Sequence, residues 1–232
     1  MLSRKTQALL EAAKGHGWVL EPDAKAMLKE RGLPVPRFAT AATRDEAMSK
    51  AHKIGYPVVA KVVSPLIVHK SDVGGVIAGI RTDHQLDAAF SRLAGLDGFE
   101  GVLVEEMLPG GVELIVGATI DLQFGPVILL GLGGTSVEIY KDTALRLAPL
   151  APKDVLSMVG ELKAHPLLEG YRGAEPVDMA ELTRLLVLFS RFVVELEGWI
   201  ESIDLNPVVC KGCLCTIADA RIMLDRGEGS PD

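Results

Sequence analysis

Short β-branched runs alternate with segments that carry helix-start signals, and this alternation restricts the possible folds more than any other feature of the sequence. The runs YPVVAKVV and GGVIAGI have the composition of strands. Thr43 with Glu46 forms a capping box ahead of the first run, and Thr82 with Gln85 forms a second box after the second run. The first hundred residues therefore predict a compact lobe that contains both helices and strands.

The second half of the chain mixes helices and strands in longer elements. Three apolar strand candidates come first, GVLVEEML, VELIVGATI and GPVILLGLGG, and helical patterns follow at about 153–164 and 178–197. The end reads ESIDLNPVVC–KG–CLCTIADARIML, which predicts a hairpin that turns at Lys211-Gly212. Together the two halves predict an α/β fold.

A glycine-rich stretch at 97–101 (Asp-Gly-Phe-Glu-Gly) suggests a boundary between two lobes. We expect the N-terminal helices and a small lobe in residues 1–100, a large lobe in residues 101–225, and a tail at 226–232. Clefts between lobes are common ligand sites, so a ligand is expected between the two.

The composition excludes several classes of protein. The 232-residue chain has a formal net charge of −7, which argues against a nucleic-acid-binding protein, because such proteins display a basic patch. The N-terminal residues lack the apolar core of a secretory signal. The most apolar helical stretch, LLVLFSRFVV, is interrupted by Ser190 and Arg191 and is too short to span a bilayer. We therefore expect a cytoplasmic protein that binds neither nucleic acid nor membrane.

The three cysteines, Cys210, Cys213 and Cys215, lie together in the predicted hairpin. Their odd number and close spacing do not fit a disulfide framework. A zinc site would need a fourth ligand, and no histidine is close in sequence. The pattern therefore favours free thiols over zinc.

Two features of the first lobe are suited to binding an anion. Lys61 lies inside the strand VVAKVV, where an unpaired cation is costly, so its amine either reaches water from an edge strand or binds a phosphate. Gly74 and Gly75 end the run HKSDVGG and let backbone N–H groups approach an anion, with a tight turn as the alternative.

Carboxylates gather at the strands of the second half. Glu105 ends one strand and Glu113 begins the next, where they could contact a nucleoside or remain solvated. Asp204 and Asn206 lie on one face of a strand, and Asp219 lies on the facing strand of the hairpin. These oxygen ligands suit Mg²⁺ shared with phosphates, with a hydrogen-bonded turn as the alternative. The order of all these features predicts a nucleotide phosphate clamp followed by a magnesium site, without a P-loop.

The chain resembles the ATP-grasp module of the NDP-forming acyl-CoA synthetases, typified by ADP-forming acetate–CoA ligase, and more distantly the β subunit of succinate–CoA ligase. The segments that carry the resemblance are IGYPVVAKVVSPLIVHKSDVGGV, VLVEEMLPGGVELIVGATIDLQFGPVILLGLGG, VEIYKDTALRLAPL, GYRG and IDLNPVV. The resemblance implies an ATP-grasp fold with the nucleotide between its two lobes.

The resemblance also implies roles for individual residues. Lys61 would hold nucleotide phosphates, and Glu138, which follows the GLGG loop, would lie near the phosphoryl site. The remaining nucleotide residues would be Gly74 and Gly75 of the glycine-rich loop, Glu105 at the strand that receives adenine, Met107, and Glu113 near the ribose. Asn206 and Asp219 would bind Mg²⁺, with Asp204 as their neighbour.

His69 is the candidate phosphoryl carrier by the same resemblance. In the two-subunit members, a phosphoryl group passes from a histidine of the CoA-binding subunit to a histidine in this loop, and then to ADP. A neutral imidazole is a nucleophile near pH 7. A loop between Pro65 and Gly74-Gly75 could swing between two sites, and Lys70 could offset the phosphate charge or point to water. The alternative is a surface histidine without a chemical role.

The implied reaction is acyl-CoA + ADP + phosphate ⇌ carboxylic acid + CoA + ATP. The chain contains no G-x-G-x-x-G after a strand, so a CoA-binding α-type subunit or domain is expected as the partner. Thr135-Ser136 replaces a bulkier apolar pair of the family. Two other functions remain open: an ATP-grasp carboxylate–amine ligase, and a non-catalytic nucleotide-binding regulatory module of an acyltransferase.

Overall fold

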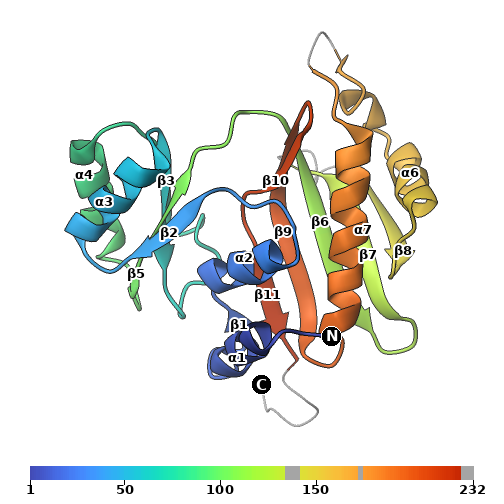
Figure 1. The fold of residues 1–232 in the computed structure, drawn as a ribbon, viewed down its shortest axis with the longest axis horizontal. Helices are drawn as coiled ribbons and strands as arrows, with labels where there is room; N and C mark the ends of the chain where they lie inside the picture. The colour runs from blue at the N-terminus through green and yellow to red at the C-terminus, as the bar shows by residue number, and fades with distance from the viewer. Residues whose placement is uncertain (134–141, 172–174, 226–232) are drawn as a thin grey trace. The chain divides into compact units, whose positions relative to one another are not determined.

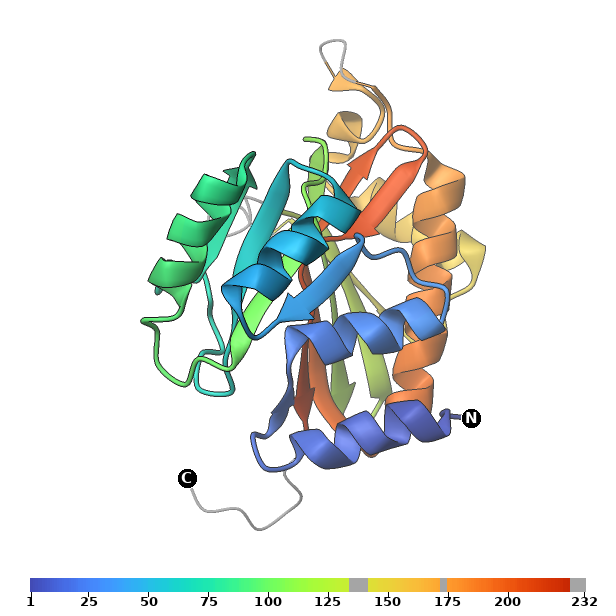
Figure 2. The same cartoon turned by 60° about the vertical axis from the view of Figure 1, so that its left-hand side comes forward.

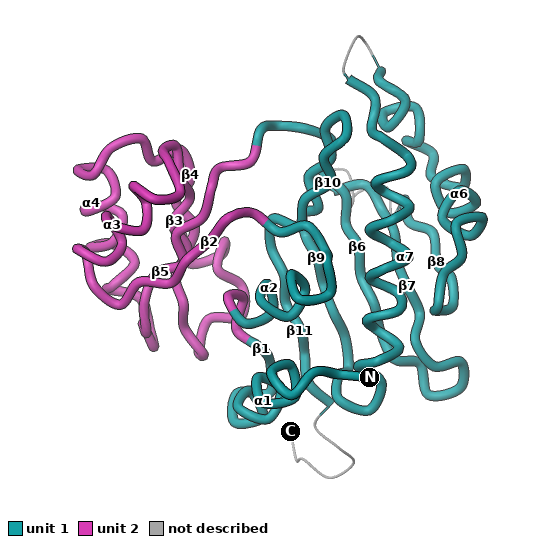
Figure 3. The backbone as a smooth tube through the Cα atoms, viewed as in Figure 1, with its two compact units in different colours: residues 1–19, 23–35, 109–232 teal, residues 20–22, 36–108 magenta. Residues whose placement is uncertain are grey.

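Figures 1 and 2 show the chain in a computed structural model, which describes residues 1–133, 142–171 and 175–225. Contacts between residues divide the chain into two compact units (Figure 3). Unit 1 comprises Met1–Val19, Asp23–Val35 and Pro109–Asp232, and unit 2 comprises Leu20–Pro22 and Pro36–Leu108.

Unit 2 is an antiparallel sheet with the strand order β2-β5-β3-β4 and two helices. The strands are β2 (Phe38–Ala41), β3 (Val58–Val63), β4 (Val76–Ile80) and β5 (Gly101–Glu106), and the helices are α3 (Arg44–Ile54) and α4 (Asp83–Leu93). The predicted N-caps are confirmed: the side chain of Thr43 accepts from the Glu46 amide, and that of Thr82 from the Gln85 amide.

One face of this sheet and the two helices form a single apolar core. Side chains alternate along a strand, so Val58, Ala60 and Val62 of β3 belong to that core. Lys61 therefore points to the other face of the sheet, away from α3 and α4. Glu105 of β5 has the same orientation, because Val102 and Val104 are the core residues of its strand. This alternation places two charged side chains together on the helix-free face.

Unit 1 is built on a seven-stranded sheet with the order β1-β11-β9-β6-β7-β8, in which β10 also pairs with β9. Its strands are β1 (Trp18–Val19), β6 (Val112–Asp121), β7 (Gly125–Leu132), β8 (Thr143–Leu147), β9 (Ile200–Lys211), β10 (Leu214–Ile217) and β11 (Arg221–Leu224). Its helical segments are α1 (Arg4–Ala13), α2 (Glu21–Glu30), α6 (Pro152–Glu161), the short 3-10 helix η1 (His165–Leu167) and α7 (Met179–Leu196).

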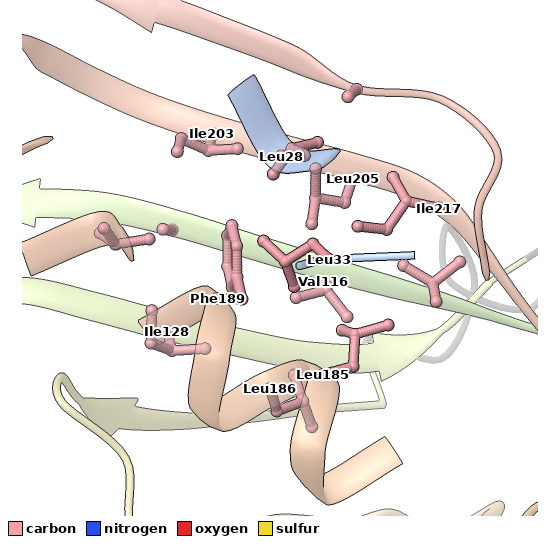
Figure 4. Close-up of a cluster of buried hydrophobic side chains, with 14 of the residues drawn as sticks. Leu28, Leu33, Val116, Ile128, Leu185, Leu186, Phe189, Ile203, Leu205 and Ile217 are labelled. Atoms are coloured by element: carbon pink, nitrogen blue, oxygen red, sulfur yellow. The ribbon is translucent and has the colours of Figure 1, made fainter. Parts of the chain in front are cut away.

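Helix α7 supplies much of the core of unit 1. Its side chains Leu185, Leu186 and Phe189 gather with Val116 of β6 and Ile128 of β7 (Figure 4). The polar break in its apolar run is used inside the protein, because the buried Ser190 hydroxyl accepts a hydrogen bond from the Leu150 amide at 2.9 Å. No helix among the described residues is long and apolar enough to cross a membrane.

The predicted C-terminal hairpin is present. Strands β9 and β10 pair from Lys211 and Leu214 outward, and Gly212 in the turn has a φ of +53°. Left-handed backbone of this kind favours glycine.

The two units differ from the predicted lobes in two places. The N-terminal helices belong to unit 1, because Leu10, Met27 and Leu28 are fully buried in the core of that unit. Strand β5 belongs to unit 2, where it pairs with both β2 and β3 and so forms the centre of the small sheet. The contact boundary therefore follows Leu108 rather than residue 100.

Candidate functional site

Lys61 lies in a buried ion-pair network on the helix-free face of the small sheet. Its amine is 2.7 Å from Glu21 Oε1 and 2.7 Å from Glu105 Oε1. The Lys61 side chain is only 6% exposed, so it does not reach water from a strand edge. A buried cation is stable only when paired in this way. The lysine predicted to hold phosphate therefore already has protein carboxylates as partners.

Lys70 joins the same network through the second oxygen of Glu21. Its amine is 3.1 Å from Glu21 Oε2, and the Lys70 side chain is 7% exposed. The structure thus corrects the idea that Lys70 points to water, since its amine lies inside the protein. We call Glu21, Lys61, Lys70 and Glu105 the charged cluster; its two lysines and two glutamates balance in formal charge.

His69, the residue before Lys70, is exposed. It lies in the loop between β3 and β4, and the loop is fixed at both ends. At one end the Ser64 hydroxyl donates to the Asp97 carbonyl at 2.7 Å. At the other end the Gly75 amide donates to the Lys70 carbonyl at 2.7 Å, and the Val62 amide donates to the Gly75 carbonyl at 2.8 Å. The exposed ring of His69 is therefore next to Lys70, a residue that is held in place.

The two glycines of this loop are required by close packing. Gly74 has a φ of +66°, and a Cβ at Gly75 would lie 2.7 Å from Val62 Cγ1 and 2.9 Å from the Lys70 carbonyl oxygen. Both amides are engaged within the loop, because Gly74 N–H donates to Ser71 and Gly75 N–H donates to Lys70. An anion that bound these amides would compete with the bonds of the loop itself.

Glu105 and Met107 differ in exposure. The Glu105 carboxylate is 4% exposed and faces Lys61, while its backbone lies between β2 and β3. Met107, just beyond the strand, is 42% exposed, and its amide donates to the Pro57 carbonyl at 3.2 Å. Of this pair, Met107 is the residue whose side chain is open to a ligand.

In unit 1, Glu113 is exposed near the start of β6. Its carbonyl accepts a hydrogen bond of 2.6 Å from the amide of Gly133, in the GLGG segment. A Cβ at Gly133 would lie 2.9 Å from that carbonyl oxygen, which explains the glycine there. Glu138, the other candidate catalytic residue, and Thr135-Ser136 lie outside the described residues.

Two of the three candidate metal ligands, Asp204 and Asn206, lie on β9, and Asp219 lies between β10 and β11. Arg221 of β11 is directly opposite Asp204 of β9, and Ile217 of β10 is directly opposite Val208. The same register, continued through the residues between β10 and β11, brings Asp219 opposite Asn206. Asp204 already has a cation, since its carboxylate is 3.2 Å from the Arg221 guanidinium.

The donor set fits a magnesium ion that is shared with phosphate. Asn206 and Asp219 supply hard oxygen ligands, which Mg²⁺ prefers, and Mg²⁺ usually keeps waters or phosphates in its remaining positions. The described residues contain no group of three or more His, Cys, Asp or Glu side chains that could hold a metal ion. The three cysteines are free thiols, of which Cys213 is exposed.

Comparisons with known proteins identify the family. Residues 11–224 match the ATP-grasp domain family. The chain is 41% identical over 228 residues to the β subunit of ADP-forming acetate–CoA ligase I of Pyrococcus furiosus, covering 95% of this chain and 98% of that one. The chain belongs to the ATP-grasp family of the ADP-forming acyl-CoA synthetases.

Solved structures of this family agree with the fold. A dinucleotide-forming acetyl-coenzyme A synthetase 1 of Ca. Korarchaeum cryptofilum, in complex with coenzyme A, Ca-AMPCP and HgCl+, matches with a TM-score of 0.90 and 41% identity, over 95% of this chain and all of that one. A second structure of that synthetase, with coenzyme A and Mg-AMPPCP, is described as having its phosphohistidine segment pointing towards the nucleotide binding site; it matches with a TM-score of 0.84 and 40% identity, again over 95% and 100% of the two chains. The predicted ATP-grasp fold is confirmed.

Sequence reasoning missed two buried charged residues of this ATP-grasp chain. Glu21, the first residue of α2, contacts two lysines of the charged cluster. Lys25, on the same helix α2, is fully buried and donates to the Ala218 carbonyl at 2.7 Å. Charged residues at the start of an ordinary surface helix look the same in sequence, so only the burial of α2 reveals them.

Proposed function

We propose that this chain is the ATP-grasp subunit of an ADP-forming acyl-CoA synthetase. The overall reaction is acyl-CoA + ADP + phosphate ⇌ carboxylic acid + CoA + ATP. In this proposal the chain binds nucleotide and Mg²⁺ and relays the phosphoryl group through His69. The similarity to β subunits along nearly their whole length supports it. The observation that carries it is the exposed imidazole of His69 next to a lysine anchored in the charged cluster.

The relay step balances without a further reagent. In the direction from ATP, a ring nitrogen of His69 attacks the γ-phosphorus and forms an N–P bond. The bond from that phosphorus to the β-phosphate oxygen breaks, and ADP leaves with the electron pair. The reverse step makes ATP from the phosphorylated ring and ADP. Neutral imidazole is the nucleophile in this step.

The assigned nucleotide residues supply position and charge rather than covalent chemistry. We assign Lys61 to the phosphates, with Gly74 and Gly75 beside it. We assign Met107, next to Glu105, to the adenine, because its side chain is 42% exposed whereas Glu105 is buried. Glu113, which is exposed at the start of β6, is assigned to the ribose. Glu138 stays a predicted residue of the phosphoryl site.

We assign Asn206 and Asp219 as the magnesium ligands, with Asp204 as their neighbour. Held by these residues, Mg²⁺ would supply positive charge that offsets the charge developing on the phosphates. The CoA and acyl sites are assigned to a partner subunit or domain. This division is supported by relatives that are named as β subunits.

Phosphorylation of His69 separates this function from its rivals. The chain is incubated with γ-³²P-ATP and Mg²⁺, and the label is tested for stability in base, where phosphohistidine survives. We expect a base-stable label that disappears in His69→Ala and persists in His84→Ala, another exposed histidine of unit 2. A carboxylate–amine ligase needs no histidine carrier, and a regulatory module would bind ATP without label. The absence of base-stable label, also with a CoA-binding partner present, would overturn the proposal.

A further inference from the structure

Building on the proposed function, we infer that Glu21 is a positioning residue of the relay. Its carboxylate holds Lys70, the neighbour of His69, and also contacts Lys61, the residue assigned to the nucleotide phosphates. Breaking the Glu21–Lys70 ion pair loosens the hold on the carrier histidine. Neither residue touches the reacting atoms in this scheme, so both act through the place they give to His69.

The geometry gives one carboxylate two partners. Glu21 Oε1 lies 2.7 Å from the Lys61 amine, and Glu21 Oε2 lies 3.1 Å from the Lys70 amine. The side chains of all three residues are at most 7% exposed. Ion pairs excluded from water are screened much less than surface pairs, and losing one partner is costly. The position of Lys70 is therefore strongly coupled to Glu21.

Lys70 is held through its backbone as well as its side chain. Its carbonyl accepts the 2.7 Å hydrogen bond from Gly75, and its amine pairs with Glu21. The Cα of His69 lies about 3.8 Å from that of Lys70, as in any trans peptide. While Lys70 is fixed, the ring of His69 can move only by rotation about its own bonds and those of one neighbouring residue.

Loss of the Glu21–Lys70 ion pair leaves the Gly75–Lys70 hydrogen bond as the remaining anchor, and opening that bond as well changes the reach of His69 substantially. The nearest element on the C-terminal side is then β4, which begins at Val76. Six residues, 70–75, separate His69 from that strand, and an extended chain spans about 3.3 to 3.6 Å per residue, so the carrier gains a reach of roughly 20 Å. On the N-terminal side, β3 ends at Val63, which gives a similar length. A carrier that serves two sites needs reach of this kind, and one that donates to a bound nucleotide needs the anchor.

The charges of the cluster link the anchor to the nucleotide. Lys61 is shared by Glu21 and Glu105, each at 2.7 Å. A phosphate that binds Lys61 competes with both carboxylates for that amine. A nucleotide phosphate at Lys61 would therefore bind within the same cluster that anchors Lys70.

A double-mutant cycle on Glu21 and Lys70 tests the inference in the full chain. The variants are Glu21→Gln, Lys70→Met and the two combined, with Arg44→Met as a control that removes an exposed ion pair of unit 2 to Asp87. Quenched-flow labelling from γ-³²P-ATP gives the rate of His69 phosphorylation, and titration gives the nucleotide Kd. We expect Lys70→Met to slow phosphorylation roughly tenfold or more while the Kd changes less than about twofold. The double variant should be no slower than the slower single variant.

Amide hydrogen exchange provides a readout that does not depend on phosphorylation. Residues 64–75 should exchange faster in Lys70→Met than in the wild type, and a non-hydrolysable ATP analogue should slow their exchange in the wild type only. If the wild type takes no label, the proposed function fails, and exchange still decides whether the anchor exists. Unchanged exchange in Lys70→Met, or additive rate effects in the cycle, would overturn the inference. Thermal melting shows whether Glu21→Gln folds. If it folds poorly, the double variant, which also removes the Lys70 amine left without Glu21, is compared with Lys70→Met instead.

Discussion

Asp204 on β9 and Arg221 on β11 face each other directly across the sheet of unit 1, with the guanidinium 3.2 Å from the carboxylate. The register on either side of the segment between β10 and β11, when continued into it, sets Asp219 against Asn206 of β9. The pairing with Arg221 offsets part of the charge of Asp204.

The first prediction ranks these ligands. Asp219→Asn should raise the Mg²⁺ concentration needed for half-maximal binding of ADP by roughly tenfold or more, since it removes a carboxylate from a site with few protein ligands. Asp204→Asn should raise it less than about threefold, because Arg221 already shares that charge. Titration of Mg²⁺ against binding of a fluorescent ADP analogue measures both. Equal effects of the two substitutions would contradict the ranking.

The second prediction concerns the stability of the charged cluster. Lys61→Met leaves Glu21 and Glu105 with Lys70 as the only lysine of the cluster, and breaking a buried pair by removing one partner costs about 3 to 5 kcal/mol. We expect a decrease of that size in the free energy of unfolding, measured by urea denaturation, together with weaker nucleotide binding.

A compensating substitution separates the two effects. Lys61→Met combined with Glu105→Gln removes one charge of each sign, so most of the lost stability should return. Nucleotide binding should remain weak, because the phosphate ligand is still missing. Recovery of nucleotide affinity in the double variant would show that Lys61 acts on the fold rather than on the phosphates.

Local signals in the sequence were sufficient for much of the fold. The caps at Thr43 and Thr82, the turn at Gly212 and the apolar stripe of α7 each depend on residues close together in the chain, and each is present. Local signals could not show which of the two sheets contains β5. Its apolar run has the same appearance in either sheet, and only pairing with β2 and β3 assigns it to unit 2.

The site residues stay predictions, and the surroundings of Lys61 were only partly predictable. A lysine within VVAKVV requires a partner, and the structure gives it two carboxylates. Its partner Glu21 is 40 residues away in sequence, and nothing local connects the two. The orientation of Lys70 was equally hidden, because a lysine beside a loop histidine usually points to water. Ion pairs between residues far apart in the chain therefore could not be predicted from the sequence.

The third prediction is a dependence of stability on pH. Hydrogen bonds from the Tyr56 hydroxyl at 2.7 Å, and from the His52 ring at 2.8 Å, lower the pKa of Asp83 below its ordinary value. A depressed carboxyl pKa contributes stability above the unfolded value of about 3.9, and this contribution is lost as the pH falls through the folded value. The difference in unfolding free energy between wild type and Asp83→Asn should therefore be largest above about pH 4 and shrink in more acidic solution.

Urea denaturation at pH 6 and at pH 3 checks this prediction. Tyr56→Phe serves as the matched variant, because it removes the larger of the two causes and leaves the aromatic ring. Its difference from the wild type should shrink in the same direction. A difference between wild type and Asp83→Asn that is constant across this range would contradict a depressed pKa of Asp83.

The fourth prediction compares three glycines of different surroundings. A Cβ at Gly75 would lie 2.9 Å from the Lys70 carbonyl oxygen, which is backbone and cannot swing aside, so Gly75→Ala should cost about 1 to 3 kcal/mol. Gly79 has a φ of +75° but open space around it, so Gly79→Ala should cost only the backbone strain, about 1 to 2 kcal/mol. Gly110 has neither restriction, and Gly110→Ala should be neutral or stabilise by up to about 1 kcal/mol.

The labelling assay distinguishes Gly75 from Gly79 more sharply than stability does. Gly75→Ala displaces the carbonyl of Lys70, the residue that positions His69, so phosphorylation from ATP should slow as it does in Lys70→Met. Gly79→Ala lies within β4, beyond the loop, and should leave the rate within about twofold of wild type at equal folded fraction. If Gly79→Ala slowed labelling as much as Gly75→Ala does, general loosening of the small sheet, rather than the position of Lys70, would account for the effect.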